Sequence, residues 1–146
     1  MTVVYSGIIE QAVFRNQAVY AGALRFAGRE EEAARVLEDA VRINPEYCDA
    51  QLNLGRTRAG LGRCREALVP LNRALLCFEQ QEFKATDVAA AHDALANCYR
   101  SLGRFAEAQW HFSALLEIDQ NSREGRTGLH ELQVIQGQNL PDAGEQ

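Results

Sequence analysis

The sequence predicts an all-helical protein built from repeated helical hairpins, and three observations support this. The 146 residues are rich in alanine, leucine, glutamate, glutamine and arginine, which favour helices, and only three are prolines. A Gly-Arg pair recurs at Gly28, Gly62 and Gly103. Apolar residues follow each pair at helical spacing, as expected for an amphipathic helix.

Three apolar positions recur after each glycine, five, nine and twelve residues along the chain. They are filled by Ala33, Leu37 and Ala40, by Ala67, Leu71 and Ala74, and by Ala108, Phe112 and Leu115. This spacing places each set on one face of a helix. Small residues occupy equivalent positions before the glycines, at Ala21, Gly55 and Ala96. The two helices of each hairpin are therefore expected to approach closely, with the glycine ending the first of them in the left-handed conformation.

The repeat resembles the tetratricopeptide repeat over roughly residues 14–122. Gly28 and Gly62 are 34 residues apart, the period of that family, whereas Gly62 and Gly103 are 41 apart. Pro45 stands where the family closes a repeat with proline. Two features depart from the pattern: Gln17, Gln51 and His92 replace the early aromatic residue, and Glu79 and Gln120 replace the later closing prolines. The resemblance implies a right-handed superhelical stack of three antiparallel hairpins.

The predicted helices lie near residues 7–27, 30–43, 46–60, 64–81, 85–102, 105–118 and 122–136. They form repeats over about 14–47, 48–81 and 89–122, and the helix over about 122–136 is expected to cap the stack with Leu129, Leu132 and Val134. We expect a single domain over 1–137 and a disordered tail over 138–146. The seven extra residues between the second and third glycines should lengthen the flanking helices and widen the angle between those repeats, and Pro70 should bend its helix.

The composition argues against several classes of function. A net charge of −5 disfavours nucleic-acid binding. The absence of a long apolar run and of a secretory signal predicts a cytoplasmic protein without membrane insertion. The histidines His92, His111 and His130 have no nucleophile and orienting acid placed beside them. We therefore expect no enzyme activity, no catalytic residue, no cofactor and no metal.

The four cysteines are Cys48, Cys64, Cys77 and Cys98. None belongs to a Cys-x-x-Cys pair, and each falls on a helical face where a small apolar residue would serve. We expect reduced, packed cysteines; a disulfide or a metal role is the alternative.

The resemblance implies a concave channel lined by the first helix of each repeat. On that face the candidate partner-binding residues are Arg15, Arg25, Asn53, Arg56, Asn97 and Arg100. Arginine forks suit carboxylates, and asparagine amides suit an extended backbone, so the expected ligand is an acidic segment or a free C-terminus of a protein partner. Asp49 and Asp93 are expected to offset part of the positive charge of this face by pairing with Arg56 and Arg100. The alternative is a solvated face of arginines paired with neighbouring acids.

One subtype of the family holds the C-terminal carboxylate of heat-shock chaperones with a basic and asparagine clamp. Only Asn53 stands where that clamp requires it. Alanine and glycine fill the other clamp positions, at Ala18, Gly22, Ala90 and Ala94. The resemblance therefore does not extend to this ligand.

Two further surfaces are candidates for contact. The apolar run from Val3 to Phe14 is expected either to pack on the first hairpin or to form a homodimer. Trp110 is expected either to pack against the capping helix or to anchor a partner.

The sequence thus predicts an adaptor or assembly factor that binds a partner segment. The alternatives are a dedicated export chaperone, such as the type III secretion chaperones that the chain resembles in size and repeat number, and a homo-oligomeric scaffold. In a further alternative, the acidic tail occupies its own groove.

Overall fold

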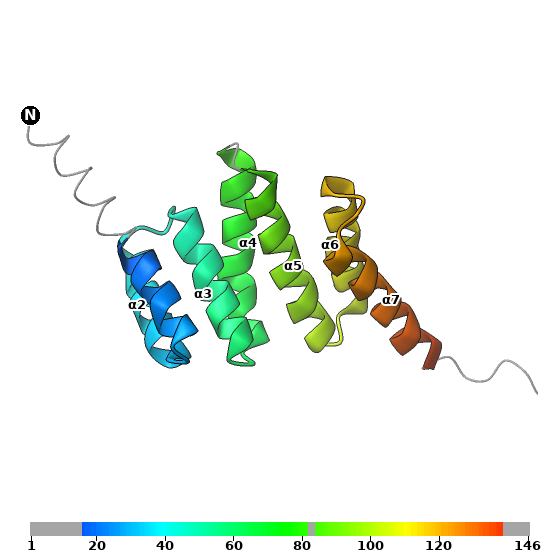
Figure 1. The fold of residues 1–146 in the computed structure, drawn as a ribbon, viewed down its shortest axis with the longest axis horizontal. Coiled ribbons are helices and arrows are strands. Elements are labelled where there is room, and N and C mark those ends of the chain that lie inside the picture. The colour runs from blue at the N-terminus through cyan, green and yellow to red at the C-terminus, as the bar shows by residue number, and fades with distance from the viewer. Residues whose placement is uncertain (1–15, 82–83, 139–146) are drawn as a thin grey trace, which may run out of the picture. The chain divides into compact units, whose positions relative to one another are not determined.

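The computed structural model describes residues 16–81 and 84–138, and every regular element in these two ranges is an α-helix. The first helix is described over residues 16–26, and six more follow it (Figure 1). They are α2 (Glu30–Ile43), α3 (Cys48–Gly60), α4 (Cys64–Gln80), α5 (Ala85–Ser101), α6 (Phe105–Ile118) and α7 (Arg123–Gln138). The prediction of an all-α repeat of helical hairpins is confirmed.

The predicted helix ends agree with the observed ones to within two residues wherever both can be compared. The largest differences are at the start of α3, which begins at Cys48 rather than at residue 46, and at the end of α7, which reaches Gln138 rather than residue 136. The N-terminal apolar run, Arg15 and residues 139–146 of the expected tail lie outside the described residues.

Each hairpin turn contains a glycine in the left-handed conformation. The φ angle is 75° at Gly28, 76° at Gly62 and 73° at Gly103. At the first turn the backbone amide of Arg29 donates to the carbonyl oxygen of Leu24 at 2.8 Å, and the other two turns repeat this bond. These bonds satisfy carbonyl groups that the end of a helix leaves without a partner. The recurring Gly-Arg pair therefore marks the helix ends, as predicted.

The chain divides into two compact units, the second of which begins at Lys84. We call them unit 1, with the helix over 16–26 and α2 to α4, and unit 2, with α5 to α7. The single domain expected over residues 1–137 stays a prediction.

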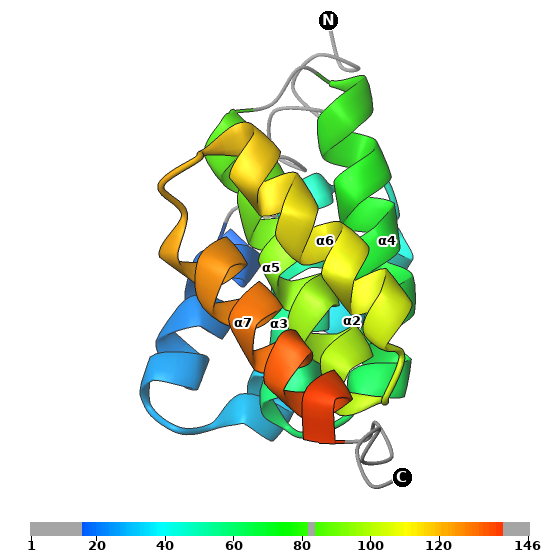
Figure 2. The same ribbon diagram turned by 90° about the vertical axis from the view of Figure 1, so that its right-hand side faces the viewer.

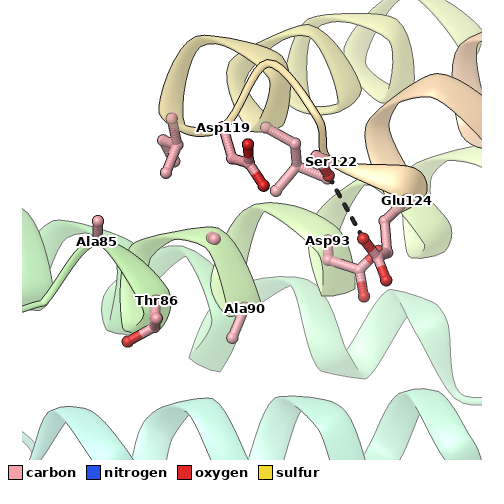
Figure 3. Close-up of a pocket in the computed structure, with 10 residues that line it drawn as sticks. Ala85, Thr86, Ala90, Asp93, Asp119, Ser122 and Glu124 are labelled. Atoms are coloured by element: carbon pink, nitrogen blue, oxygen red, sulfur yellow. Dashed lines mark hydrogen bonds between the residues drawn. The ribbon is translucent and has the colours of Figure 1, made fainter.

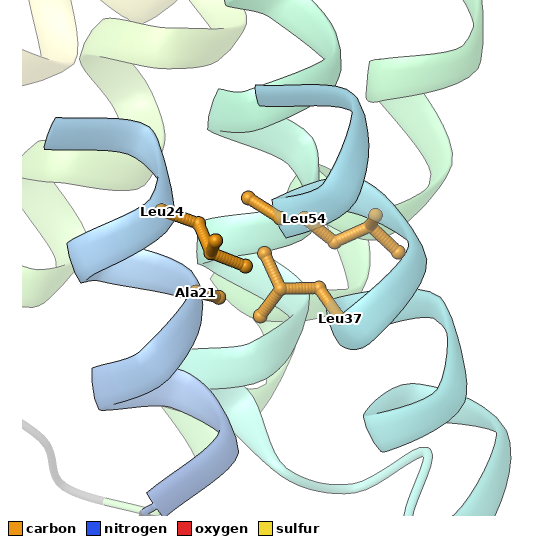
Figure 4. Packing of buried hydrophobic residues seen from close by; sticks show 5 residues of the cluster. Ala21, Leu24, Leu37 and Leu54 are labelled. Carbon is orange, nitrogen blue, oxygen red and sulfur yellow. The ribbon is translucent and has the colours of Figure 1, made fainter. Parts of the chain in front are cut away.

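The core of unit 1 contains the apolar positions that the repeat predicts. Ala21 and Leu24 from the first helix meet Leu37 of α2 and Leu54 of α3 (Figure 4). In the next hairpin a Cβ atom added to Gly55 would overlap the side chain of Leu71 on α4. The small residue at this position is therefore required for the close contact between α3 and α4.

A disulfide bond joins Cys48 and Cys77 in unit 1, which contradicts the expectation that these cysteines are reduced. Cys48 begins α3 and Cys77 lies near the end of α4, and the antiparallel hairpin brings these ends together with a Cα–Cα distance of 5.6 Å. The sequence argument assessed each cysteine on its own helix and so missed the pair. Cys64 and Cys98 are free, and Cys98 is buried as expected.

The residues added between the second and third repeats lengthen the helices, as predicted. Both α4 and α5 have 17 residues, against 13 in α3 and 14 in α6. Pro70 lies inside α4 and is buried, and the helix continues through it to Gln80. The expected bend at Pro70 and the expected change of angle between repeats stay predictions.

In unit 2, α7 packs against both α5 and α6 (Figure 2). Phe112 of α6 and Leu132 of α7 belong to one buried cluster, and a Cβ atom added to Gly128 would overlap the Phe112 ring. The predicted capping helix is thus present, with Leu132 buried and Leu129 partly buried. Val134 was expected in the same contact but is 46% exposed, so its assignment to the capping face was wrong.

Candidate functional site

Two arginines from consecutive repeats lie close together in unit 1. Partial burial lowers the pKa of Arg25, the positive charge of Arg56 lowers it further, and Glu30 opposes the shift. Neither guanidinium forms an ion pair or hydrogen bond with any residue of the described ranges 16–81 and 84–138. Two neighbouring positive charges therefore have no carboxylate of the described residues in direct contact.

Asn53 belongs to the same helix as Arg56, three residues earlier, and is half-buried. Its backbone carbonyl accepts a hydrogen bond from the Thr57 hydroxyl at 2.7 Å. Residues three apart on a helix are neighbours on its surface, so the Asn53 amide extends the polar face that Arg56 begins. Arg15, the remaining basic residue predicted for this repeat face, lies outside the described residues.

Arg100, the arginine predicted for the binding face in unit 2, is in a different environment. One nitrogen of the Arg100 guanidinium pairs with Glu131 of α7, and another donates to Asn97 Oδ1 at 2.7 Å. Asn97 Nδ2 in turn donates to Asp93 Oδ1 at 3.0 Å. Two of the predicted binding residues, Asn97 and Arg100, are thus joined in one hydrogen-bonded chain with two carboxylates.

Arg100 pairs with Glu131, and the expected pairing of Asp93 with Arg100 stays a prediction. On a helix, residues seven apart are two turns away from each other, whereas Glu131 reaches Arg100 across the contact between α5 and α7. Sequence analysis missed Glu131 because it treated α7 only as an apolar cap. The polar spacing of Glu124, Thr127 and Glu131 on that helix was the available signal.

Two hollows lie beside this chain of side chains. A small one of about 160 Å³ is bordered by Asn97, Arg100 and Glu131. A larger one of about 450 Å³ lies between the start of α5 and the connection from α6 to α7 (Figure 3). Asp93 and Glu124 border both, so the two hollows adjoin along one face of unit 2.

A buried histidine pair joins α5 to α6. The Nδ1 atoms of His92 and His111 are 2.8 Å apart, so one ring donates a proton to the other. Burial, and secondarily the charge of His92, lower the pKa of His111 to about 4. Tyr99 stacks on His111 at a ring-centroid distance of 5.5 Å. Above this pKa the buried His111 ring is neutral.

Trp110 lies beside this pair, with its ring centroid 5.7 Å from that of His92. The side chain is 62% exposed, so it is not packed beneath the capping helix as expected. Its alternative role as a partner anchor stays a prediction.

The described ranges contain no group of three or more histidine, cysteine, aspartate or glutamate side chains placed to hold a metal ion. None of the helices described is both long and apolar enough to cross a lipid bilayer.

Comparison with known proteins finds sequence similarity over parts of the chain. The tetratricopeptide repeat model matches residues 89–122, which are the third predicted repeat. In sequence, the chain is 29% identical over 105 residues to anaphase-promoting complex subunit 7 of Dictyostelium discoideum. That match covers 72% of this chain but only 17% of the relative's length.

Solved structures share the fold at low sequence identity. An Arabidopsis OM64 TPR domain matches with a TM-score of 0.76 and 14% identity, over 86% of this chain and 98% of that one. The second TPR domain of human RPAP3, in complex with the HSP70 peptide SGPTIEEVD, matches with a TM-score of 0.70 and 15% identity, over 82% and 98%. The type III secretion translocator chaperone SycD of Yersinia enterocolitica matches with a TM-score of 0.74 and 16% identity, over 87% and 88%.

The third repeat matches the family model, the two earlier hairpins repeat its spacing, and solved tetratricopeptide-repeat domains share the fold of the chain.

Proposed function

We propose that this protein is a non-catalytic adaptor or assembly factor that binds an acidic segment of a partner protein on the face formed by the first helices of the first two repeats, in unit 1. One observation carries the proposal: Arg25 and Arg56 lie close together in unit 1 with no ion-pair partner among the described residues. A carboxylate placed between two guanidinium groups would relieve their mutual repulsion and gain charge-assisted hydrogen bonds.

The Asn53 amide supports the same proposal, because it offers both a donor and an acceptor to an extended peptide backbone beside Arg56. The peptide SGPTIEEVD bound by the human RPAP3 domain carries three acidic residues, so a related fold accommodates such a ligand. The chain lacks most of the chaperone-tail clamp, and the proposed site shares only Asn53 with it. Arg15 belongs to the proposed site by its place on the repeat.

A pull-down from native cell extract, analysed by mass spectrometry, tests the proposal. The test variant is Arg25→Glu/Arg56→Glu. The control is Arg35→Glu/Arg65→Glu, which makes the same change in net charge at exposed positions on α2 and α4. We expect a partner that the wild type and the control retain and the test variant loses. Retention of the same partner by all three forms would contradict the proposed site.

The retained partner also separates an adaptor from a dedicated export chaperone. A chaperone of that kind is expected to be required for the stability of one partner, so deletion of its gene would lower the level of that protein in cells. An adaptor would leave the partner's level unchanged and alter only the complex in which the partner is found. A retained protein that is a second copy of this chain would indicate the homo-oligomeric alternative.

A further inference from the structure

The larger hollow of unit 2 differs in chemistry from the arginine face of unit 1. Its walls include three alanines of α5, Ala85, Ala89 and Ala90, and its apolar floor includes Leu115 and Ile118 of α6. The alanine side chains are too short to fill the space between the helices, which leaves about 450 Å³ open beside α5 (Figure 3). The hollow is large enough to receive an apolar side chain from another molecule.

The first turn of α5 contributes to the hollow. The family match begins at residue 89, but α5 begins four residues earlier, at Ala85. Ala85 and Thr86 lie in this first turn and line the hollow together with Ala89 and Ala90.

The charged residues that line the hollow are all acidic. They are Asp93 of α5, Asp119 of the connection after α6, and Glu124 of α7. Lys84 and Arg123 are close in sequence, but neither is among the lining residues. The rim of an apolar pocket thus carries negative charge.

Two of these carboxylates, Asp119 and Glu124, form only neutral hydrogen bonds within the described part of the chain. Asp119 Oδ1 accepts from the Asn121 backbone amide at 2.9 Å, and Glu124 Oε2 lies 3.4 Å from the Ser122 hydroxyl. Neither Asp119 nor Glu124 forms an ion pair with a residue in the described parts of the chain. Glu131, which borders the adjoining small hollow, forms an ion pair with Arg100.

We propose that the alanine-walled hollow of unit 2 binds a partner segment in which an aliphatic or aromatic side chain is flanked by lysine or arginine. The apolar side chain occupies the space beside Ala89 and Ala90, and the flanking cations pair with Asp119 and Glu124. This inference rests on the proposed function, since it assigns a second, oppositely charged contact to the same interaction module. Charge complementarity selects this ligand over the acidic segment proposed for unit 1.

An array of short immobilised peptides tests the inference. Each peptide carries a varied apolar pair flanked on both sides either by lysines or by glutamates, and binding of the full-length chain is measured by fluorescence at low and high salt. We expect the wild type to bind lysine-flanked peptides, more weakly at high salt, and to leave the glutamate-flanked set of the same apolar pairs unbound in this hollow.

Two variants assign the binding to the hollow. Asp119→Asn/Glu124→Gln removes both charges with little change of shape, and should weaken binding of the lysine-flanked peptides about fivefold or more. Ala90→Leu fills the hollow without changing a charge and should abolish binding.

Glu117→Gln is the matched control, because it removes an exposed carboxylate of α6 that does not line the hollow. Thermal melting monitored by circular dichroism checks that each variant is folded.

Binding of lysine-flanked peptides that is unchanged in Asp119→Asn/Glu124→Gln or in Ala90→Leu would overturn the inference. The inference would also be overturned if no lysine-flanked peptide on the array bound the wild type. Failure here leaves the proposed function intact if Arg25→Glu/Arg56→Glu still loses its partner in the pull-down. If neither lysine-flanked nor acidic peptides bind and no partner is retained, the proposed function itself fails.

Discussion

Arg56 in unit 1 and Arg100 in unit 2 both lie on the first helix of a repeat, yet their surroundings make them chemically different. Arg56 lies near a second arginine and has no ion-pair partner among the described residues, whereas Arg100 is held by Glu131 and Asn97. The difference arises from the neighbouring helix, which supplies Arg25 in one unit and Glu131 in the other. The repeat therefore determines on which helix face an arginine lies. The side chains of the adjacent helix determine whether the charge of that arginine is available to a ligand.

The two units also differ in how their hairpins are held together. Unit 1 contains the disulfide between Cys48 and Cys77, and unit 2 contains the buried pair of His92 and His111. The first responds to reductant and the second to acid. Each unit can therefore be weakened separately, and hydrogen exchange followed by mass spectrometry reports the two units on different peptides.

The largest expected effect comes from breaking the disulfide. Cys48 and Cys77 are 29 residues apart, and a crosslink over a loop of this length is expected to stabilise the folded state by about 3–4 kcal/mol. The variant Cys48→Ser/Cys77→Ser should lose that stability and should exchange faster in α3 and α4. Peptides of α6 and α7 should exchange at the wild-type rate.

The free cysteine Cys64 provides a control for this experiment. It is partly exposed and forms no disulfide, so Cys64→Ser should leave exchange in α3 and α4 unchanged. Reductant should reproduce the effect of the double variant on the wild type and should not affect the double variant further. If reductant leaves the stability of the wild type unchanged, the disulfide does not stabilise unit 1, and this difference between the units is absent.

Acid is expected to weaken unit 2 by a somewhat smaller amount. His111 has a pKa of about 4 in the folded chain against an ordinary value of 6.5, so between these two pH values the unfolded chain binds more protons than the folded one. Stability from this group is therefore complete above pH 6.5 and is lost as the pH falls toward 4. The shift corresponds to a loss of up to about 3 kcal/mol, measurable by urea denaturation over this range.

The variant His111→Asn tests how much of the acid sensitivity of unit 2 comes from His111. The asparagine amide can replace Nδ1 as a partner of His92, but it does not titrate. The free energy of unfolding of this variant should fall less between pH 6.5 and pH 4 than that of the wild type. An equal fall in both would assign the acid sensitivity to other groups.

Local spacing in the sequence was sufficient to predict much of the fold. Gly28, Gly62 and Gly103 located the hairpin turns because left-handed backbone at the end of a helix favours glycine. Small residues such as Gly55 and Ala96 predicted the close helix contacts, because the repeat places them against the second helix of each hairpin. These features depend on residues within one hairpin, where helical periodicity is a reliable guide.

Features that depend on contacts between separate helices were missed. The disulfide joins the start of α3 to the end of α4, and the ion pair of Arg100 joins α5 to α7. The alanine-walled hollow depends on how far α5 extends before the third repeat. The stripe of arginines was predicted, but whether each arginine is paired depended on side chains that the repeat pattern does not specify.

The smallest expected effects test the comparison between the two arginines directly. Arg100→Gln removes the pair with Glu131 and should lower the free energy of unfolding by about 0.5–1 kcal/mol, because both side chains are partly exposed. Arg56→Gln removes a charge that repels Arg25, so it should leave stability unchanged or raise it slightly. Urea denaturation at low and high salt measures both: salt should reduce the deficit of Arg100→Gln and any gain of Arg56→Gln. A loss of stability in Arg56→Gln as large as that in Arg100→Gln would mean that Arg56 is also paired, and the contrast on which the proposed binding face of unit 1 depends would be gone.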